Sequence, residues 1–352
     1  MALKDRLLRM IRADGPMPVS LYMQTCLHDP KEGYYATRPG LGEDFTTAPE
    51  ISQIFGELIG LWVVHEWIGL GRPAPFSLIE PGPGRATLMV DALRAMAQNS
   101  DGRACLEAME LYLIEASPAL RKIQTERLAE HTPKYLSVLD ELPDQPALIV
   151  ANEFLDCLPV RQFVKADGNK WHERKVGAKD DELIWGIDKS DDNTPQFDQH
   201  DQTGVELQPG LETFALSLAA HLKKTQPLRA LIFDYGPDDH PAEDTLRAFR
   251  LGKQVDPLAA PGECDLTVDV DFSELRRQAE KAGLVVYGAV TQSAFLLALG
   301  AELRMQQLVK AHPDRAQEIF ESAKRLVDPA DLGTRFKAIC LSSEGLGTPA
   351  GF

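Results

Sequence analysis

Short apolar runs alternate with helix-length segments over most of the chain after residue 75. The runs FSLIE, LYLIE, KYLSV, ALIVA, LRALIFDYG, LVVYGAV and RFKAICLS have the length of β-strands. Continuous apolar runs are typical of strands that are buried on both faces, and helix-length connections between them favour a parallel arrangement. The pattern therefore predicts an α/β fold of the Rossmann-like type, with a largely parallel sheet.

The first 70 residues follow a helical pattern instead. Apolar residues recur at helical spacing in MALKDRLLRMIRA, VSLYMQTCLHD and ISQIFGELIGLWVVHEWIGLG. The loop GYYATRPGLGEDFTTAPE separates the second helix from the third and is too long for an ordinary connector. We expect N-terminal helices and an active-site loop over residues 1–75, followed by the α/β core over residues 76–352.

Three insertions are expected in the core, at about residues 160–225, 237–275 and 292–330. Within the first, RQFVKADGNKWHERKV and ELIWGID predict strands of a hairpin around Asp167 and Gly168. The irregular second insertion and this hairpin are expected to form a cap on the substrate side.

Composition and charge exclude several classes of protein. The 352 residues include 37 basic and 53 acidic side chains, so the formal charge of −16 argues against nucleic acid as a partner. No stretch approaches the roughly 18 apolar residues of a membrane span, and the first residues do not resemble a secretory signal, so we expect a cytoplasmic protein. The five cysteines lack metal-ligand spacing, which predicts reduced thiols and no metal site.

The segment SLIEPGPGRATLMVDALR contains the most informative motif. A strand ends at Glu80, a tight turn follows at Gly82 and Gly84, and a helix then begins. Glycines let the backbone turn sharply and bring a ligand close to its amides. The next strand, LYLIE, ends at Glu115, where this architecture places a carboxylate beside a cofactor ribose. A purely structural turn and a simple helix cap remain alternative interpretations of these residues.

The motif distinguishes two classes of nucleotide ligand. A dinucleotide site normally has a third glycine and places a pyrophosphate at the helix N-terminus, and that glycine is missing here. An acidic residue two positions before Gly-x-Gly instead resembles motif I of class I methyltransferases. A nicotinamide-dependent oxidoreductase is therefore the less favoured interpretation.

Polar residues also follow the strand ALIVA, in the segment ANEFLDCLPV. Asn152, Glu153 and Asp156 are expected at the carboxyl edge of the sheet, where open α/β sheets bind their ligands. We predict that they act on the methyl acceptor. Asn152 and Asp156 could alternatively cap a short helix while the apolar residues between them pack inward.

Several motifs in order give a more specific resemblance. GEDFTTAPEISQIFGELIG, IEPGPGRATLMVDALR, ANEFLDCLPV, LIFDYG, DPLAAPGECDLTVDVDF and LGTRFKAIC resemble the MidA-like family of class I methyltransferases, over residues 14–341. The resemblance implies a seven-stranded, mostly parallel sheet whose last strand is antiparallel, and S-adenosyl-L-methionine as cofactor. It also implies a protein substrate, since mitochondrial members of the family are associated with symmetric dimethylation of an arginine on a respiratory complex I subunit.

The resemblance also implies roles for individual residues. Glu80, Gly82 and Gly84 would belong to the cofactor motif, with Glu115 at the ribose. Thr47, Pro49 and Glu50 would belong to a loop that closes over the cofactor, and Asn152, Glu153 and Asp156 to the acceptor side. The length of the loop and its glycines Gly40 and Gly42, as hinges, are consistent with a lid that excludes water. This sequence departs from the family at Ala86, where glycine is common, and we expect one methyl group to be tolerated there.

The chemistry of an arginine acceptor makes two of these residues candidates for catalysis. A guanidinium is protonated at ordinary pH, so carboxylates must orient the attacking nitrogen, and Glu153 and Asp156 could do so. Two alternatives remain: a methyltransferase of the same fold with another acceptor, and a non-catalytic complex I assembly factor that keeps the cofactor pocket.

Overall fold

The protein forms two compact units, each of them built from three segments of the chain. The computed structural model describes residues 3–37, 47–166, 170–189, 194–197, 203–222, 227–237 and 244–352. Unit 1 comprises Met1–Phe45, Leu155–Leu211 and Asp239–Asp271, and unit 2 comprises Thr46–Phe154, Glu212–Asp238 and Phe272–Phe352. The predicted organisation, with residues 1–75 preceding a core from residue 76, stays a prediction.

Unit 2 contains a seven-stranded sheet in the order β14-β15-β10-β5-β2-β3-β4. β10 pairs with β5, β5 with β2, β2 with β3 and β3 with β4 in parallel, whereas β15 is antiparallel to both β10 and β14. This confirms the predicted Rossmann-like sheet with an antiparallel last strand. The strands are β2 (Phe76–Pro81), β3 (Met109–Ile114), β4 (Lys134–Leu136), β5 (Ala147–Asn152), β10 (Leu228–Tyr235), β14 (Val285–Thr291) and β15 (Phe336–Ser342).

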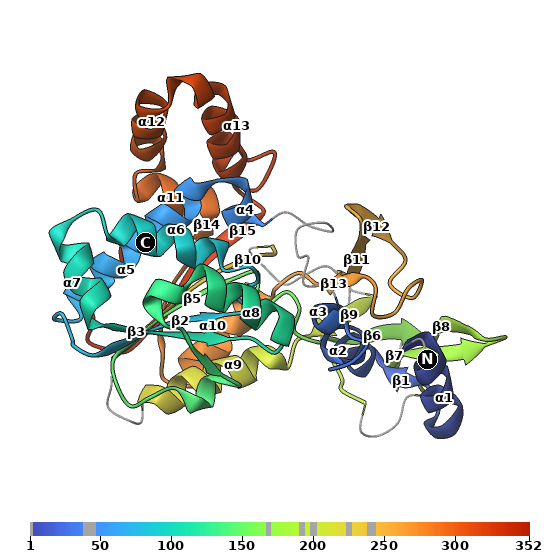
Figure 1. Ribbon diagram of the computed structural model, residues 1–352. Coiled ribbons are helices and arrows are strands. Elements are labelled where there is room, and N and C mark those ends of the chain that lie inside the picture. Colours follow the sequence, from blue (N-terminus) through green and yellow to red (C-terminus); the bar gives the residue numbers. More distant parts are fainter. Residues whose placement is uncertain are drawn as a thin grey trace. The chain divides into compact units, whose positions relative to one another are not determined.

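Helices cover both faces of this sheet. Every residue of the central strands β2 and β10 is buried, which explains why their sequences lack polar alternation. Helices α5 and α6 lie on one face, and α9 and α10 lie on the other (Figure 1). The helices of this unit, with short 3₁₀ turns, are α4 (Ala48–Ile51), α5 (Gln53–Gly69), α6 (Thr87–Met96), α7 (Ser100–Ala108), α8 (Pro118–Arg127), η1 (Ala129–His131), η2 (Leu139–Glu141), α9 (Gly210–Leu222), α10 (Phe272–Lys281), α11 (Gln292–Ala298), α12 (Ala301–Ala311), η3 (Pro313–Arg315) and α13 (Ala316–Val327).

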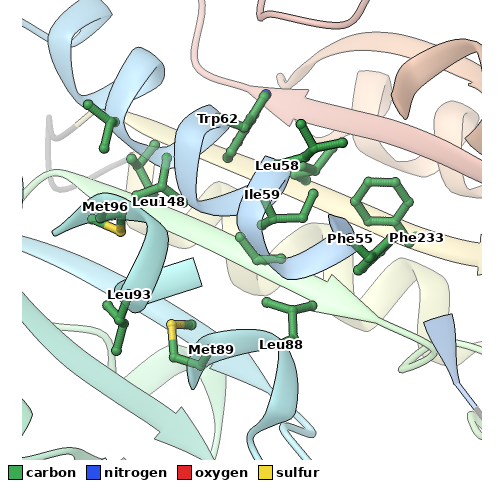
Figure 2. Packing of buried hydrophobic residues seen from close by; sticks show 14 of the residues in the cluster. Phe55, Leu58, Ile59, Trp62, Leu88, Met89, Leu93, Met96, Leu148 and Phe233 are labelled. Atoms are coloured by element: carbon green, nitrogen blue, oxygen red, sulfur yellow. The ribbon is translucent and has the colours of Figure 1, made fainter. Parts of the chain in front are cut away.

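A large apolar cluster lies between the sheet and helices α5 and α6. Figure 2 shows Phe55 and Trp62 of α5, Met89 of α6, and Phe233 of β10 within this packing. The two helices approach closely because α5 carries glycine at the contact: a Cβ atom at Gly60 would lie 2.4 Å from the carbonyl oxygen of Ala92. This packing fixes the start of α6 relative to the sheet.

Helices α12 and α13 form a hairpin inserted between β14 and β15 (Figure 1). The hairpin is joined to α5 through the buried carboxylate of Glu57. Arg304 of α12 donates to both Glu57 oxygens, from Nε at 2.7 Å and from Nη2 at 3.1 Å, and Arg94 of α6 donates at 3.2 Å. A bidentate pair of this kind fixes orientation as well as distance.

Unit 1 contains a five-stranded sheet and a three-stranded sheet. The larger follows the order β1-β7-β6-β9, with β8 also paired to β7, and the smaller follows the order β12-β11-β13. Strands β6 and β7 form the predicted antiparallel hairpin, whose turn at Asp167 and Gly168 lies outside the described residues. The elements are α1 (Leu3–Asp14), β1 (Met17–Pro18), α2 (Val19–His28), α3 (Tyr34–Thr37), β6 (Arg161–Ala166), β7 (Lys170–Lys179), β8 (Glu182–Ile187), β9 (Gly204–Leu207), β11 (Arg247–Arg250), β12 (Lys253–Val255) and β13 (Asp265–Thr267).

The described helices include none with the length and apolar character needed to cross a membrane. The five cysteines are free thiols, and four of them are buried.

Candidate functional site

The glycine turn follows the central strand β2 at the carboxyl edge of the sheet. Gly82 and Gly84 have φ angles of 63° and 51°, in the region that favours glycine. The amide of Gly82 donates to the carbonyl of Ile114 at the end of β3, at 2.9 Å. A Cβ atom at Gly82 would lie 3.0 Å from the ring of Phe154, so a side chain there would crowd the turn.

Ala86 ends the turn and begins α6. Its φ angle of 61° places it in the left-handed region, where an L side chain costs roughly 1 to 2 kcal/mol, and its methyl group is buried. The alanine thus occupies a backbone conformation in which glycine is the usual residue. Arg127 of α8 binds the residues on either side of Ala86, because its Nη1 donates to the carbonyl of Arg85 at 2.6 Å and to Thr87 Oγ1 at 2.9 Å.

Glu80 lies at the end of β2 and is 3% exposed. Its Oε2 atom accepts no hydrogen bond from the residues that the structure describes. Burial raises the pKa of the Glu80 carboxyl to about 8. Burial of an acceptor atom without a donor is unfavourable, so Oε2 suits a ligand that supplies one.

Glu115 follows β3 and is held by several donors. Its Oε1 accepts from the amide of Ser117 at 2.8 Å, and its Oε2 accepts from Gln124 Nε2 at 3.1 Å. Burial raises the pKa of the Glu115 carboxyl, while these hydrogen bonds favour its ionised form. Gln124 Nε2 also donates to the carbonyl of Gly84 at 2.7 Å, so the same amide joins Glu115 to the glycine turn.

Asn152 and Glu153 lie where β5 ends. Glu153 has a φ angle of 49°, a strained conformation for a residue with a side chain. Its amide donates to the carbonyl of Phe233 at 2.8 Å, and its Oε1 accepts from Asn152 Nδ2 at 3.0 Å. The strain is thus maintained by contacts with the neighbouring strand and side chain.

The segment from Thr47 to Glu50 lies against the same edge. The amide of Ala48 donates to Glu153 Oε1 at 3.4 Å, and Thr87 Oγ1 donates to Glu50 Oε1 at 2.6 Å. Thr47 precedes the short helix α4, and Pro49 is buried within it. The predicted hinges Gly40 and Gly42 lie outside the described residues.

Asp156 belongs to unit 1, whereas the other predicted site residues belong to unit 2. Its Oδ2 accepts from Thr267 Oγ1 at 2.9 Å. Tyr35 lies in the same environment and donates from its hydroxyl to Asp265 at 3.4 Å. Burial raises the pKa of Tyr35 well above its usual range, and the charges of Asp265 and Asp156 add to this effect.

Three buried acceptor atoms at the carboxyl edge indicate the kind of ligand it suits. Glu80 Oε2, Gln124 Oε1 and Asn152 Oδ1 have no donor among the described residues. The ammonium, ribose hydroxyl and adenine amino groups of S-adenosyl-L-methionine are all hydrogen-bond donors. A pyrophosphate offers only acceptors and negative charge, so it would be repelled. These three acceptor atoms therefore fit the sulfonium nucleoside better than the pyrophosphate of a dinucleotide.

The comparison with protein families agrees with this geometry. Residues 58–290 match the model of the family described as "Putative S-adenosyl-L-methionine-dependent methyltransferase". The chain belongs to this methyltransferase family. The protein is therefore an S-adenosyl-L-methionine-dependent methyltransferase.

Close relatives cover nearly all of the chain. A Drosophila melanogaster protein named "Protein arginine methyltransferase NDUFAF7 homolog, mitochondrial" is 36% identical over 97% of this chain and 84% of its own length. The Homo sapiens protein arginine methyltransferase NDUFAF7, mitochondrial, is 35% identical over 94% of this chain and 81% of its own length. The family resemblance seen in the sequence is confirmed.

The fold is also that of solved structures. A Burkholderia thailandensis protein crystallised with S-adenosyl-homocysteine superposes with a TM-score of 0.84 at 24% identity, covering 99% of this chain and 93% of the other. A native crystal structure from the same organism gives the same TM-score at 25% identity, covering 99% and 94%.

The predicted cytoplasmic location is wrong, because the relatives are named as mitochondrial proteins. The prediction depended on the lack of a secretory signal. That feature carries no information about a mitochondrial address, which is a different kind of segment.

Sequence reasoning missed Gln124, Thr87 and Arg127. Gln124 had a visible signal, because it lies four residues after Leu120 on the buried face of α8, where an apolar residue is expected. Thr87 and Arg127 had none, since their partners are about 40 residues away in the chain.

Proposed function

We propose that this methyltransferase transfers the methyl group of S-adenosyl-L-methionine to an arginine side chain of a protein. The observation that carries the proposal is the similarity, at about 35% identity over nearly the whole chain, to proteins named as arginine methyltransferases. We further propose that the acceptor is a subunit of respiratory complex I, on the basis of the family resemblance in the motifs. The fold by itself does not identify the methyl acceptor, because one fold can carry many different activities.

In this proposal, unit 2 binds the cofactor. When bound, S-adenosyl-L-methionine supplies an electrophilic methyl group on a sulfonium. Glu80 accepts a hydrogen bond from a cationic or hydroxyl donor of the cofactor, and Glu115 accepts from the ribose. Gly82 and Gly84 allow the backbone to approach, while the segment from Thr47 to Glu50 covers the edge and excludes water.

Glu153 orients the acceptor in this proposal. A guanidinium has several equivalent nitrogens, and a carboxylate that binds one side localises the lone pair on the nitrogen that attacks. Glu153 is suited to this role because its main chain is fixed to β10 and its Oε1 is fixed by Asn152. Asp156 is proposed as a second carboxylate, held by Thr267.

Peptide mapping by mass spectrometry tests the proposal. The full chain is incubated with methyl-deuterated S-adenosyl-L-methionine and with individually purified complex I subunits, and in parallel with a mitochondrial extract that contains other proteins and small molecules. We expect label on one or a few arginines of one subunit. The matched control is Gly84→Val, which should fail to bind the cofactor, because a β-branched side chain at a φ angle of 51° strains the turn.

Each other outcome contradicts a defined part of the proposal. Label on lysine, on an N-terminus or on a small molecule would exclude arginine and favour a methyltransferase with another acceptor. Label on arginines of unrelated proteins only would exclude complex I. Tight binding of S-adenosylhomocysteine without transfer to any subunit would favour the non-catalytic assembly factor.

A further inference from the structure

Gln124 lies between the glycine turn and the acid at the end of β3. It is located on α8, and its side chain is completely buried. Its Nε2 donates to Gly84 O at 2.7 Å and to Glu115 Oε2 at 3.1 Å. These two acceptors come from different strand ends, 31 residues apart by their numbers in the sequence.

Packing alone does not explain a glutamine at this position. Leu120, one helical turn earlier, is buried on the same face of α8, and a leucine or methionine at residue 124 would fill similar space. Burying an amide is unfavourable unless its polar atoms are paired. Gln124 Oε1 is buried and has no donor among the described residues, so the side chain retains an unsatisfied acceptor.

The hydrogen bonds of Gln124 fix the plane of the Glu115 carboxylate. Ser117 N holds one oxygen and Gln124 Nε2 holds the other. A carboxylate anchored at both oxygens cannot rotate about its last bond without losing a hydrogen bond. Each oxygen can still accept from a further donor, since an ionised carboxylate has about four acceptor positions.

We propose that Gln124 is a positioning residue for the nucleoside part of the cofactor. It holds Glu115 in the orientation that accepts from the ribose hydroxyls, and it couples that carboxylate to the backbone of Gly84. The proposal depends on cofactor binding and on the role of Glu115 at the ribose. It is independent of which acceptor is methylated.

Calorimetric titration with two ligands tests this role without any methyl transfer. S-adenosylhomocysteine and its 2′-deoxyribose analogue differ only in one hydroxyl. The wild-type protein should bind the ribose form at least about tenfold more tightly, because a carboxylate that has lost its hydrogen-bond donor is penalised. In Gln124→Met this ratio should fall to about two- to threefold, mostly through weaker binding of the ribose form.

Gln292→Met is the matched control. Gln292 is also completely buried and also donates from Nε2 to one carbonyl, that of Leu326 at 2.9 Å. Its Oε1 likewise has no donor within the part of the chain that the structure describes. The same substitution there should lower thermal stability and leave the ligand ratio at the wild-type value. A ratio that falls equally in both variants would show a general loss of stability and overturn the proposal.

A second variant keeps the proposal testable if Gln124→Met does not fold. Gln124→Glu keeps the size and shape of the side chain, but its carboxyl group has one hydrogen at most and cannot donate to both Gly84 O and Glu115 Oε2. The same loss of discrimination is expected. An unchanged ratio in the folded variant, or a wild-type protein that binds both ligands equally, would overturn the positioning role. Neither result would bear on arginine as the acceptor.

Discussion

At the residue scale, the buried carboxyl of Glu80 gives the clearest dependence on pH. Its pKa is raised to about 8 in the folded protein, compared with 4.5 in the unfolded chain. Between these values the folded state binds more protons than the unfolded state, so stability falls as pH rises. The difference between the two pKa values corresponds to a loss of about 5 kcal/mol in the free energy of unfolding at pH 8 and above, since one pKa unit is worth about 1.4 kcal/mol.

Glu80→Gln should remove this pH-dependent part of the free energy of unfolding from the ligand-free protein. Urea unfolding at pH 5 and at pH 8 is the measurement. The wild-type protein should lose several kcal/mol more than the variant between the two values, while the variant should bind S-adenosylhomocysteine at least about tenfold more weakly. The exposed Glu107 serves as a control, since Glu107→Gln should reproduce the wild-type pH profile. Parallel profiles for wild type and Glu80→Gln would refute the assignment.

The second prediction at this scale concerns Glu153. Glu153→Gln keeps the size of the side chain and its carbonyl acceptor for Asn152, but removes the negative charge. We expect transfer to fall by about 100-fold, the usual effect of removing one electrostatic contact from a transition state, with cofactor affinity within about twofold of wild type. Single-turnover kinetics and calorimetry separate the two effects. A variant with normal transfer would exclude Glu153 as the orienting group.

At the scale of elements, the periodicity of apolar residues predicted the sheet well. β2, β3, β5, β10, β14 and β15 all coincide with apolar runs, because a strand covered on both faces needs no polar alternation. The antiparallel position of β15 was available only through the family resemblance. Strand order is decided by pairing between distant segments, which local patterns do not contain.

The contacts that assemble the site were less predictable for the same reason. Glu80 and the two glycines of the turn could be identified because they stand together in a recognisable strand, turn and helix. The links from Thr87 to Glu50 and from Gln124 to Gly84 join residues 37 and 40 positions apart. A single sequence gives the spacing of such residues but not their approach in space.

A prediction about elements concerns the ion pair of Glu66 on α5 and Arg229 on β10. Both side chains are buried, Arg229 also donates to the carbonyl of Gly347, and Glu66 Oε1 accepts from the amide of Ala350 at 2.9 Å. The pair therefore joins the C-terminal segment to the core. Glu66→Leu should cost about 3 to 5 kcal/mol, because it leaves Arg229 buried without a counterion.

The double variant Glu66→Leu with Arg229→Met provides the comparison. Replacing both charges by apolar groups removes the uncompensated ion, so most of the lost stability should return. Unfolding in guanidinium chloride, with the wild type and both single variants, completes a double-mutant cycle. If the double variant is as unstable as the two single losses added together, the ion pair contributes no coupling and the interpretation is wrong.

At the scale of the whole molecule, the chain alternates between the two units. Six segments belong alternately to unit 1 and unit 2, so the chain passes between them five times. Neither unit is a continuous piece of sequence, so a single truncation of the chain cannot isolate either unit intact. The candidate cofactor residues nevertheless all belong to unit 2, whereas Asp156 belongs to unit 1. Cofactor binding should therefore stabilise the two units to different extents.

Hydrogen exchange measures this difference. A ligand present at about 100 times its dissociation constant adds about 2.7 kcal/mol to any opening that destroys its site, which slows exchange about 100-fold. With S-adenosylhomocysteine, amides of β2, β3 and β5 should slow by this amount if they exchange through such openings, while those of β6 and β7 in unit 1 should slow by less than about threefold. The same concentration of NAD should change neither set. Equal slowing in both units would contradict this prediction, because it would mean that the two units open together as one cooperative structure.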